Sequence, residues 1–150
     1  MCDQIKQLIK AHAIPRKFFE RIRGTGNYSV LIDANKPLKA AGTYYQAGAY
    51  DNEILCEDCE KKFSDFDNYG WQILGKPSLA NPLYDDFEEF PYAYKIDCNT
   101  DKIRRFILAV LWRASVSRNS FYSAVNLGPY ESRLKEGVGF KPTDPDVGYR

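Results

Sequence analysis

Residues 54–70, ILCEDCEKKFSDFDNYG, hold the feature that most constrains the fold of this chain: two cysteines, Cys56 and Cys59, separated by two residues. Two apolar residues precede the pair, as at the end of a strand, and a helical pattern follows it. A tight turn between a strand and a helix points both sulfurs the same way, which suits one metal ion. Two other interpretations stay open, namely structural thiols without a metal and a redox-active pair.

The composition indicates a single folded domain. The chain has 150 residues, of which 44% are hydrophobic and 15% aromatic, enough for one apolar core. The formal net charge is +1, so binding to nucleic acid would have to rest on a local basic cluster. We expect one domain over residues 1–137 and a loose tail, rich in glycine and proline, over residues 138–150.

The start of the chain argues against export. Its first 20 residues lack the uninterrupted apolar core of a signal peptide, and no apolar run approaches the ~18 residues that cross a bilayer. We therefore expect a cytoplasmic protein without membrane contact. In that compartment cysteines serve as thiols or metal ligands before they form disulfides.

The N-terminal half mixes strand and helix patterns. Residues 4–15 alternate loosely as a short strand that leads into His12, and Pro15 suits the first position of a helix. Residues 28–32 predict a strand, residues 40–50 are strand or loop, and a second helix pattern begins at Lys61. The apolar faces expected on the two helices are Ile14, Phe18, Phe19 and Ile22 in the first, and Phe63, Phe66, Gly70, Ile73 and Leu74 in the second.

The C-terminal half contains the strongest helix pattern. Residues 75–91 are rich in proline and acidic side chains and predict a solvated loop, whereas residues 92–98 alternate as a strand. Residues 99–118 predict a long helix that Asn99 or Thr100 can cap, and residues 127–137 predict a turn and a helix. The apolar face expected on the long helix is Ile103, Phe106, Ile107, Val110 and Leu111.

Several residues are candidates for polar or metal-binding roles. Arg113 lies within the mostly apolar long helix and needs a carboxylate or phosphate partner, and a structural ion pair is favoured over a substrate contact. Cys98 ends a predicted strand and suits a buried core cysteine. Further ligands for a metal at the cysteine pair would come from Cys2, Cys98, His12, Asp58 or Glu60.

Four segments, taken in order, carry a resemblance to a known group of proteins. They are LIKAHAIPRKFF (8–19), YDNEILCEDCEKKFSDFDNYG (50–70), FILAVLWRASVS (106–117) and LGPYESRLK (127–135). The chain resembles an uncharacterised group of bacterial proteins distantly related to HNH endonucleases. The resemblance implies an α+β fold of the ββα-metal type, in which a β-hairpin and the following helix clamp a catalytic metal ion, here with additional helices.

Position by position, the resemblance implies a cleavage site with altered ligands. His12 takes the place of the general base, Asp51 that of an asparagine that orients the base, and Glu60 that of a metal-binding histidine. Ala11 replaces the usual acidic ligand. A carboxylate such as that of Glu60 can hold Mg²⁺ or Mn²⁺, which would serve as the catalytic cation.

The resemblance also implies a structural zinc ion, Zn²⁺. Cys56 and Cys59 would hold it, and Cys2 is the remnant of an earlier cysteine pair. A basic cluster directly after His12 is suited to binding phosphates of DNA or RNA. Its members are Arg16, Lys17, Arg21 and Arg23.

Three functions follow from these patterns. The first is a metal-dependent, HNH-like nuclease that cleaves phosphodiester bonds in nucleic acid. The alternative is a catalytically inactive, zinc-binding module that binds nucleic acid or a protein partner, and a third is a structural subunit whose aromatic surface packs in a homo-oligomer. Each residue also has a simpler interpretation: His12 as a core or capping histidine, Glu60 as a helix-dipole partner, and the basic cluster as a solvated face.

Overall fold

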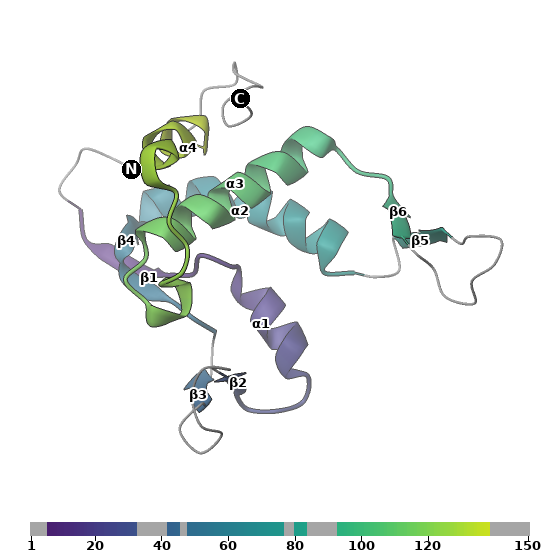
Figure 1. Ribbon diagram of the computed structural model, residues 1–150, viewed down its shortest axis with the longest axis horizontal. Helices are drawn as coiled ribbons and strands as arrows, with labels where there is room; N and C mark the ends of the chain where they lie inside the picture. The colour runs from purple at the N-terminus through teal and green to yellow at the C-terminus, as the bar shows by residue number, and fades with distance from the viewer. Residues whose placement is uncertain (1–5, 33–41, 46–47, 77–79, 84–92, 139–150) are drawn as a thin grey trace.

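The computed structural model describes residues 6–32, 42–45, 48–76, 80–83 and 93–138. These residues form a mixed α+β protein, which confirms the expected class. The strands of the described residues pair into three two-stranded antiparallel sheets, β1–β4, β2–β3 and β5–β6. Figure 1 shows helices α2 and α3 crossing the middle of the molecule, with β1–β4 near one end of the pair and β5–β6 beyond the other.

The cysteine pair lies where a strand passes into a helix, as the sequence predicts. Strand β1 (Leu8–Ala11) pairs with β4 (Asp51–Cys56), with Leu8 opposite Cys56 and Ala11 opposite Asp51. Helix α2 (Glu57–Leu74) follows β4 at once and starts one turn earlier than the expected Lys61. Its first turn carries three acidic residues, which the positive end of the helix dipole favours.

Helix α3 (Thr100–Val116) packs along α2 and forms the centre of the main core. The Asn99 side chain caps it by accepting a hydrogen bond from the backbone N–H of Lys102 at 3.0 Å, so the predicted cap is confirmed. Helix α4 (Glu131–Val138) closes the core from the C-terminal side, after short 3₁₀ turns at Ser120–Tyr122 and Gly128–Tyr130. The buried cluster consists of Ala11, Leu55, Cys56, Cys59, Phe63, Ala109, Trp112, Leu134 and Val138.

The buried side of α3 matches the predicted one only in part, because Phe106 is buried as expected but two other members of the predicted face are not. Ile107 and Leu111, expected in the core, are 45% and 38% exposed, whereas Trp112 and Arg113 are buried. The cause is that α3 is apolar around most of its circumference, so the hydrophobic pattern alone cannot select the buried side. The polar partner of Arg113 lies on α2 and makes that selection.

The first helix also departs from its predicted face. Helix α1 (Arg16–Arg23) begins after Pro15, as predicted. Phe19 is buried in a second cluster with Ala13, Ala49, Ala114 and Tyr122, but Ile22 is 80% exposed. The expected stripe is therefore buried only in part.

Two hairpins lie outside this core. Strand β2 (Ser29–Ile32) pairs with β3 (Gly42–Tyr45), and β5 (Ala80–Leu83) pairs with β6 (Ala93–Ile96). Strands β2 and β6 confirm the strands predicted within residues 28–32 and 92–98. Strand β3 shows that part of residues 40–50, predicted as strand or loop, is a strand. Strand β5 corrects the predicted loop, because a proline is tolerated in the edge strand of a two-stranded sheet.

The Arg113 side chain confirms the predicted ion pair. It is fully buried, and its two terminal nitrogens donate to both carboxylate oxygens of Asp67 on α2 at 2.8 and 2.6 Å. Its Nε donates to the Ala109 carbonyl at 3.3 Å, and the guanidinium carbon lies 4.8 Å from the centre of the Phe63 ring. Each of the three guanidinium nitrogens thus donates a hydrogen bond inside the protein.

We expect Arg113→Ala to lower the free energy of unfolding by about 3–5 kcal/mol, because it leaves the Asp67 carboxylate without its buried partner. Urea denaturation followed by circular dichroism measures the change. Arg118→Ala is the matched control, because its ion pair with Glu53 is exposed and should matter little. Equal losses in the two variants would contradict the central role of the buried pair.

Candidate functional site

Both cysteines of the central pair are buried at the corner between β4 and α2. Cys56 occupies the residue position just before α2 at 3% exposure, Cys59 lies in the first turn of α2 at 2% exposure, and both belong to the main core cluster. Neither forms a disulfide. The pair supplies donor atoms suited to half of a tetrahedral zinc site.

The other zinc ligands are not identified by the structure. Cys2 lies outside the described residues. Within the part of the chain that the structure describes, no group of three or more His, Cys, Asp or Glu side chains is placed to hold a metal ion. Cys98 is a half-buried free thiol just after β6 and is not part of either core cluster.

His12 lies one residue beyond β1, beside the aromatic ring of Tyr50. The two ring centres are 6.0 Å apart and the planes are tilted by 56°. The ammonium group of Lys10 sits 3.7 Å from the centre of the same Tyr50 ring. The histidine proposed as general base is therefore half-buried at the end of the β1–β4 ladder where Asp51 begins β4.

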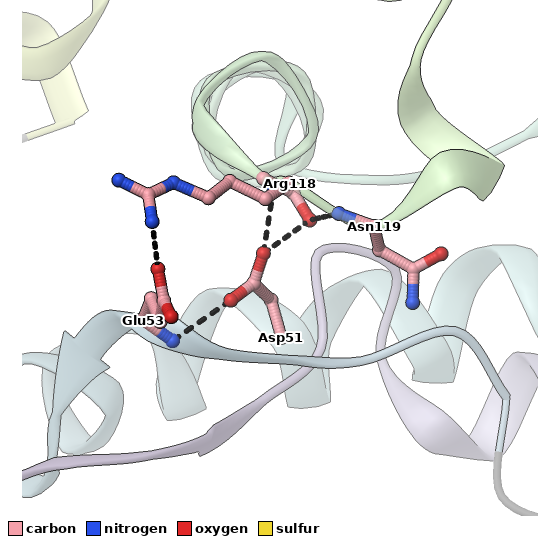
Figure 2. A network of polar contacts seen from close by, with 5 residues as sticks. Asp51, Glu53, Arg118 and Asn119 are labelled. Atoms are coloured by element: carbon pink, nitrogen blue, oxygen red, sulfur yellow. Dashed lines mark hydrogen bonds and ion pairs between the residues drawn. The ribbon is translucent and has the colours of Figure 1, made fainter.

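The Asp51 carboxylate points to the segment that follows α3, as Figure 2 shows. One oxygen accepts the backbone N–H of Glu53 at 2.8 Å. The other accepts the Ser117 hydroxyl at 2.9 Å and the backbone N–H of Arg118 at 2.6 Å. The same segment is held again by Asn119, whose side-chain amide donates to the Tyr50 carbonyl at 2.8 Å.

These contacts set the charge state of Asp51. Burial raises the pKa of its carboxyl, but the hydrogen bonds from Glu53, Arg118 and Ser117 together outweigh burial and hold the pKa below its usual value of 3.8. Both oxygens of the ionised group are occupied by protein donors. The carboxylate joins β4 to the end of α3, a role that the sequence pattern did not indicate.

Glu60 faces a different neighbourhood. It shares one face of α2 with Phe63 and Asp67, at spacings of three and seven residues. Burial raises the pKa of its carboxyl, the Arg113 guanidinium lowers it and the Asp67 carboxylate raises it. Its Oε2 atom is buried and has no hydrogen-bond donor among the described residues.

The β1–β4 register decides how the three proposed catalytic residues are distributed. Asp51 and Cys56 are the two ends of β4, so His12 and Asp51 lie at one end of the ladder. Glu60 is in the first turn of the helix that leaves the other end. Its charged neighbours are the Arg113–Asp67 pair.

The four proposed phosphate-binding residues lie on α1. Arg16 pairs with Glu20 across one helical turn at 2.8 Å, and Lys17 donates to the Asn68 side chain at 3.3 Å. Arg21 donates to the carbonyl of Gly75, which ends α2, where a cation stabilises the negative end of the helix dipole. Arg23 is half-buried in the last turn.

An exposed aromatic pair near α1 was not singled out by the sequence pattern. Tyr28 and Tyr44 are 52% and 67% exposed, and their ring centres are 5.0 Å apart in an edge-to-face arrangement. Tyr44 lies on β3 and Tyr28 directly precedes β2, the strand that α1 contacts. The signal available in the sequence was the abundance of tyrosine in residues 28–50.

Comparisons of the chain with known protein families, with curated proteins and with solved structures find no match. No helix among the described residues is long and apolar enough to cross a membrane. The function is therefore argued from the residues and their contacts.

We expect Asp51→Asn to lower the free energy of unfolding by about 1–3 kcal/mol at neutral pH, because the amide presents a donor to groups that already donate. Since the folded-state pKa of Asp51 is lowered, the contribution of its carboxylate to the free energy of unfolding is complete above about pH 4 and is lost as the pH falls through that lower pKa. The gap in the free energy of unfolding between wild type and variant should thus narrow as the solution is made more acidic. Urea midpoints measured from about pH 7 down to about pH 2.5 test this, and a gap that is constant with pH would contradict it.

Proposed function

We propose that the protein is an HNH-like module that binds nucleic acid, with a zinc ion at Cys56 and Cys59 and without an effective cleavage centre. The order of β1, β4 and α2 along the chain, with His12 after the first strand and the cysteine pair before the helix, is consistent with the ββα unit that the resemblance implies. The observation that carries the binding function is an exposed basic helix beside an exposed aromatic pair.

The contacts of the proposed catalytic residues favour binding over cleavage. Phosphodiester hydrolysis needs a base and a cation held by oxygen ligands. Ala11 is fully buried and offers no side-chain ligand, and both Asp51 oxygens accept protein hydrogen bonds. Burial raises the pKa of the Glu60 carboxyl, which disfavours the ionised form that would bind a cation.

Helix α1 presents its basic residues on a firmly anchored element. Phe19 is buried, and Phe18 packs edge-on against Trp71, with 5.2 Å between ring centres, and stacks on Phe106, with 5.9 Å between ring centres. The Arg16–Glu20 pair is exposed and of the i,i+4 kind, so it contributes little to stability. Arg16 can therefore exchange this partner for a phosphate at low cost.

The aromatic pair adds a second mode of contact. Proteins that bind single strands combine basic side chains, which follow the backbone, with aromatic rings, on which bases stack. Tyr44, the more exposed ring of the pair, can offer such a surface next to the helix that carries the basic residues. Duplex and single-stranded probes belong in the same test for this reason.

We expect the wild-type protein to bind short DNA or RNA probes with an affinity that falls as salt rises, measured by fluorescence anisotropy. Replacing both Arg16 and Lys17 by Gln should weaken binding at least about tenfold at low salt and reduce the salt slope by about 2. The matched control replaces Arg133 and Lys135 of α4 by Gln. These two residues are exposed, and Figure 1 shows α4 and α1 on opposite sides of the α2–α3 pair.

The same preparation separates binding from cleavage. With Mg²⁺ or Mn²⁺ added, plasmid should stay intact, and His12→Ala should leave probe binding unchanged. Nicking that His12→Ala abolishes would instead establish the nuclease that the resemblance implies. An α4 control that binds as weakly as the α1 variant, or a wild-type protein that binds no probe, would contradict the binding function.

We expect protein purified without chelators to carry about one zinc ion per chain, measured by elemental analysis. Cys56→Ser and Cys59→Ser should each lose the metal and lower the melting temperature, because two buried sulfur ligands are then no longer available together. Cys98→Ser is the control and should retain zinc, and Cys2→Ser tests the third proposed ligand. Wild-type protein without zinc would refute the metal site.

A further inference from the structure

An apolar groove of about 270 Å³ lies between α1 and α3. Every described side chain that lines it is hydrophobic, and Ile107 and Leu111, one helical turn apart on α3, are 45% and 38% exposed. The described lining residues are Ile14, Phe18, Phe106, Ile107, Val110 and Leu111. This is the face of α3 that the sequence pattern assigns to the core.

A groove of this kind favours a protein partner over a polar ligand. Exposed aliphatic side chains that adjoin one another on a helix lose contact with water when a second apolar surface covers them. Among the residues that the structure describes, none that lines the groove is polar and could orient a nucleotide or other charged small molecule. The question is therefore which protein surface fits it.

We propose that a second copy of this chain covers the groove, with the two α3 helices antiparallel about a twofold axis. Helix α3 supplies both the wall of the groove and the side chains that project beside it. A twofold contact needs that self-complementarity, because one patch must serve both subunits. With Ile107 of one copy opposite Leu111 of the other, the apolar stripe formed by Ile107 and Leu111 in each copy lies against the groove of its partner.

The charges beside the stripe fit the antiparallel arrangement. Asp101 accepts from Arg104 at 2.7 Å and from Arg105 at 2.9 Å, and with Lys102 these residues give the first turns of α3 a formal net charge of +2 (three basic side chains against one acidic). Near the other end of α3, the Ser115 hydroxyl donates to the Glu131 carboxylate at 2.8 Å. Arg118, just beyond this end, forms an ion pair with Glu53, and Glu131 supplies the negative charge beside Ser115.

The helical spacing puts these charges on the same side of the stripe. Arg104, Leu111 and Ser115 follow one another at intervals of seven and four residues, so they share one side of α3. When Ile107 of one copy faces Leu111 of the other, Arg104 of the first lies opposite the Ser115 region of the second. The excess positive charge then meets Glu131, and the twofold axis repeats the contact.

Analytical ultracentrifugation over a series of protein concentrations tests the proposal, in reducing buffer because Cys98 is a free thiol. The wild-type protein should dimerise. Ile107→Glu and Leu111→Glu should each raise the dimer dissociation constant at least about tenfold, since a symmetric interface carries every substitution twice. Leu83→Glu is the matched control, because Leu83 lies on β5 and is 38% exposed, like Leu111.

A charge-reversal series tests the orientation without touching the apolar stripe. Arg104→Glu and Glu131→Arg should each weaken the dimer, and the two together should restore it in part. Circular dichroism confirms that each variant is folded. A wild-type protein that is monomeric at all concentrations, or a dimer that survives both glutamate substitutions on α3, overturns the proposal, and single charge reversals without effect overturn the antiparallel arrangement.

Discussion

The orientation of the two central helices depends on the buried ion pair between Arg113 and Asp67. A fully buried guanidinium is tolerated only when its donors are satisfied, and both carboxylate oxygens of Asp67 accept from it. Because Asp67 belongs to α2, this requirement turns the Arg113 side of α3 inward. Ile107 and Leu111, on the opposite side of α3, are consequently left at the surface. One polar contact thus determines both the core and the apolar groove.

A second polar link attaches the β1–β4 ladder to this helical pair. Asp51 starts β4 and accepts hydrogen bonds from Ser117 and Arg118, just beyond the end of α3. At the other end of β4, Cys56 ends the strand and Cys59 lies in the first turn of α2, both within the core. Because β4 is held at both ends, the paired segment around His12 has a defined position. The same contacts leave both oxygens of the Asp51 carboxylate engaged by protein donors.

The sequence predicted what depends on local rules. The cap at Asn99, the strand–helix corner at the cysteine pair and the need of Arg113 for a carboxylate all follow from neighbouring residues or from one residue's chemistry. It did not predict that Ile107 and Leu111 lie at the surface of α3, because apolar residues cover most of that helix. The hydrogen bond between Asp51 and Ser117 could not be predicted from the sequence either, because the two residues lie 66 positions apart in the chain. The location of the cysteine pair was thus predictable, whereas the surroundings of Asp51 and Glu60 were not.

The proposed binding surface and the proposed dimer share helix α1. Phe18 lines the groove, while Arg16 is exposed to solvent in the same helix. In the dimer each copy would therefore bring one basic helix, with its neighbouring tyrosine pair, to the same assembly. Two such surfaces on one nucleic-acid strand raise the effective concentration of the second contact once the first has formed. A chain of net charge +1 gains little from bulk electrostatics, so this doubling of a local cluster is a physically reasonable route to useful affinity.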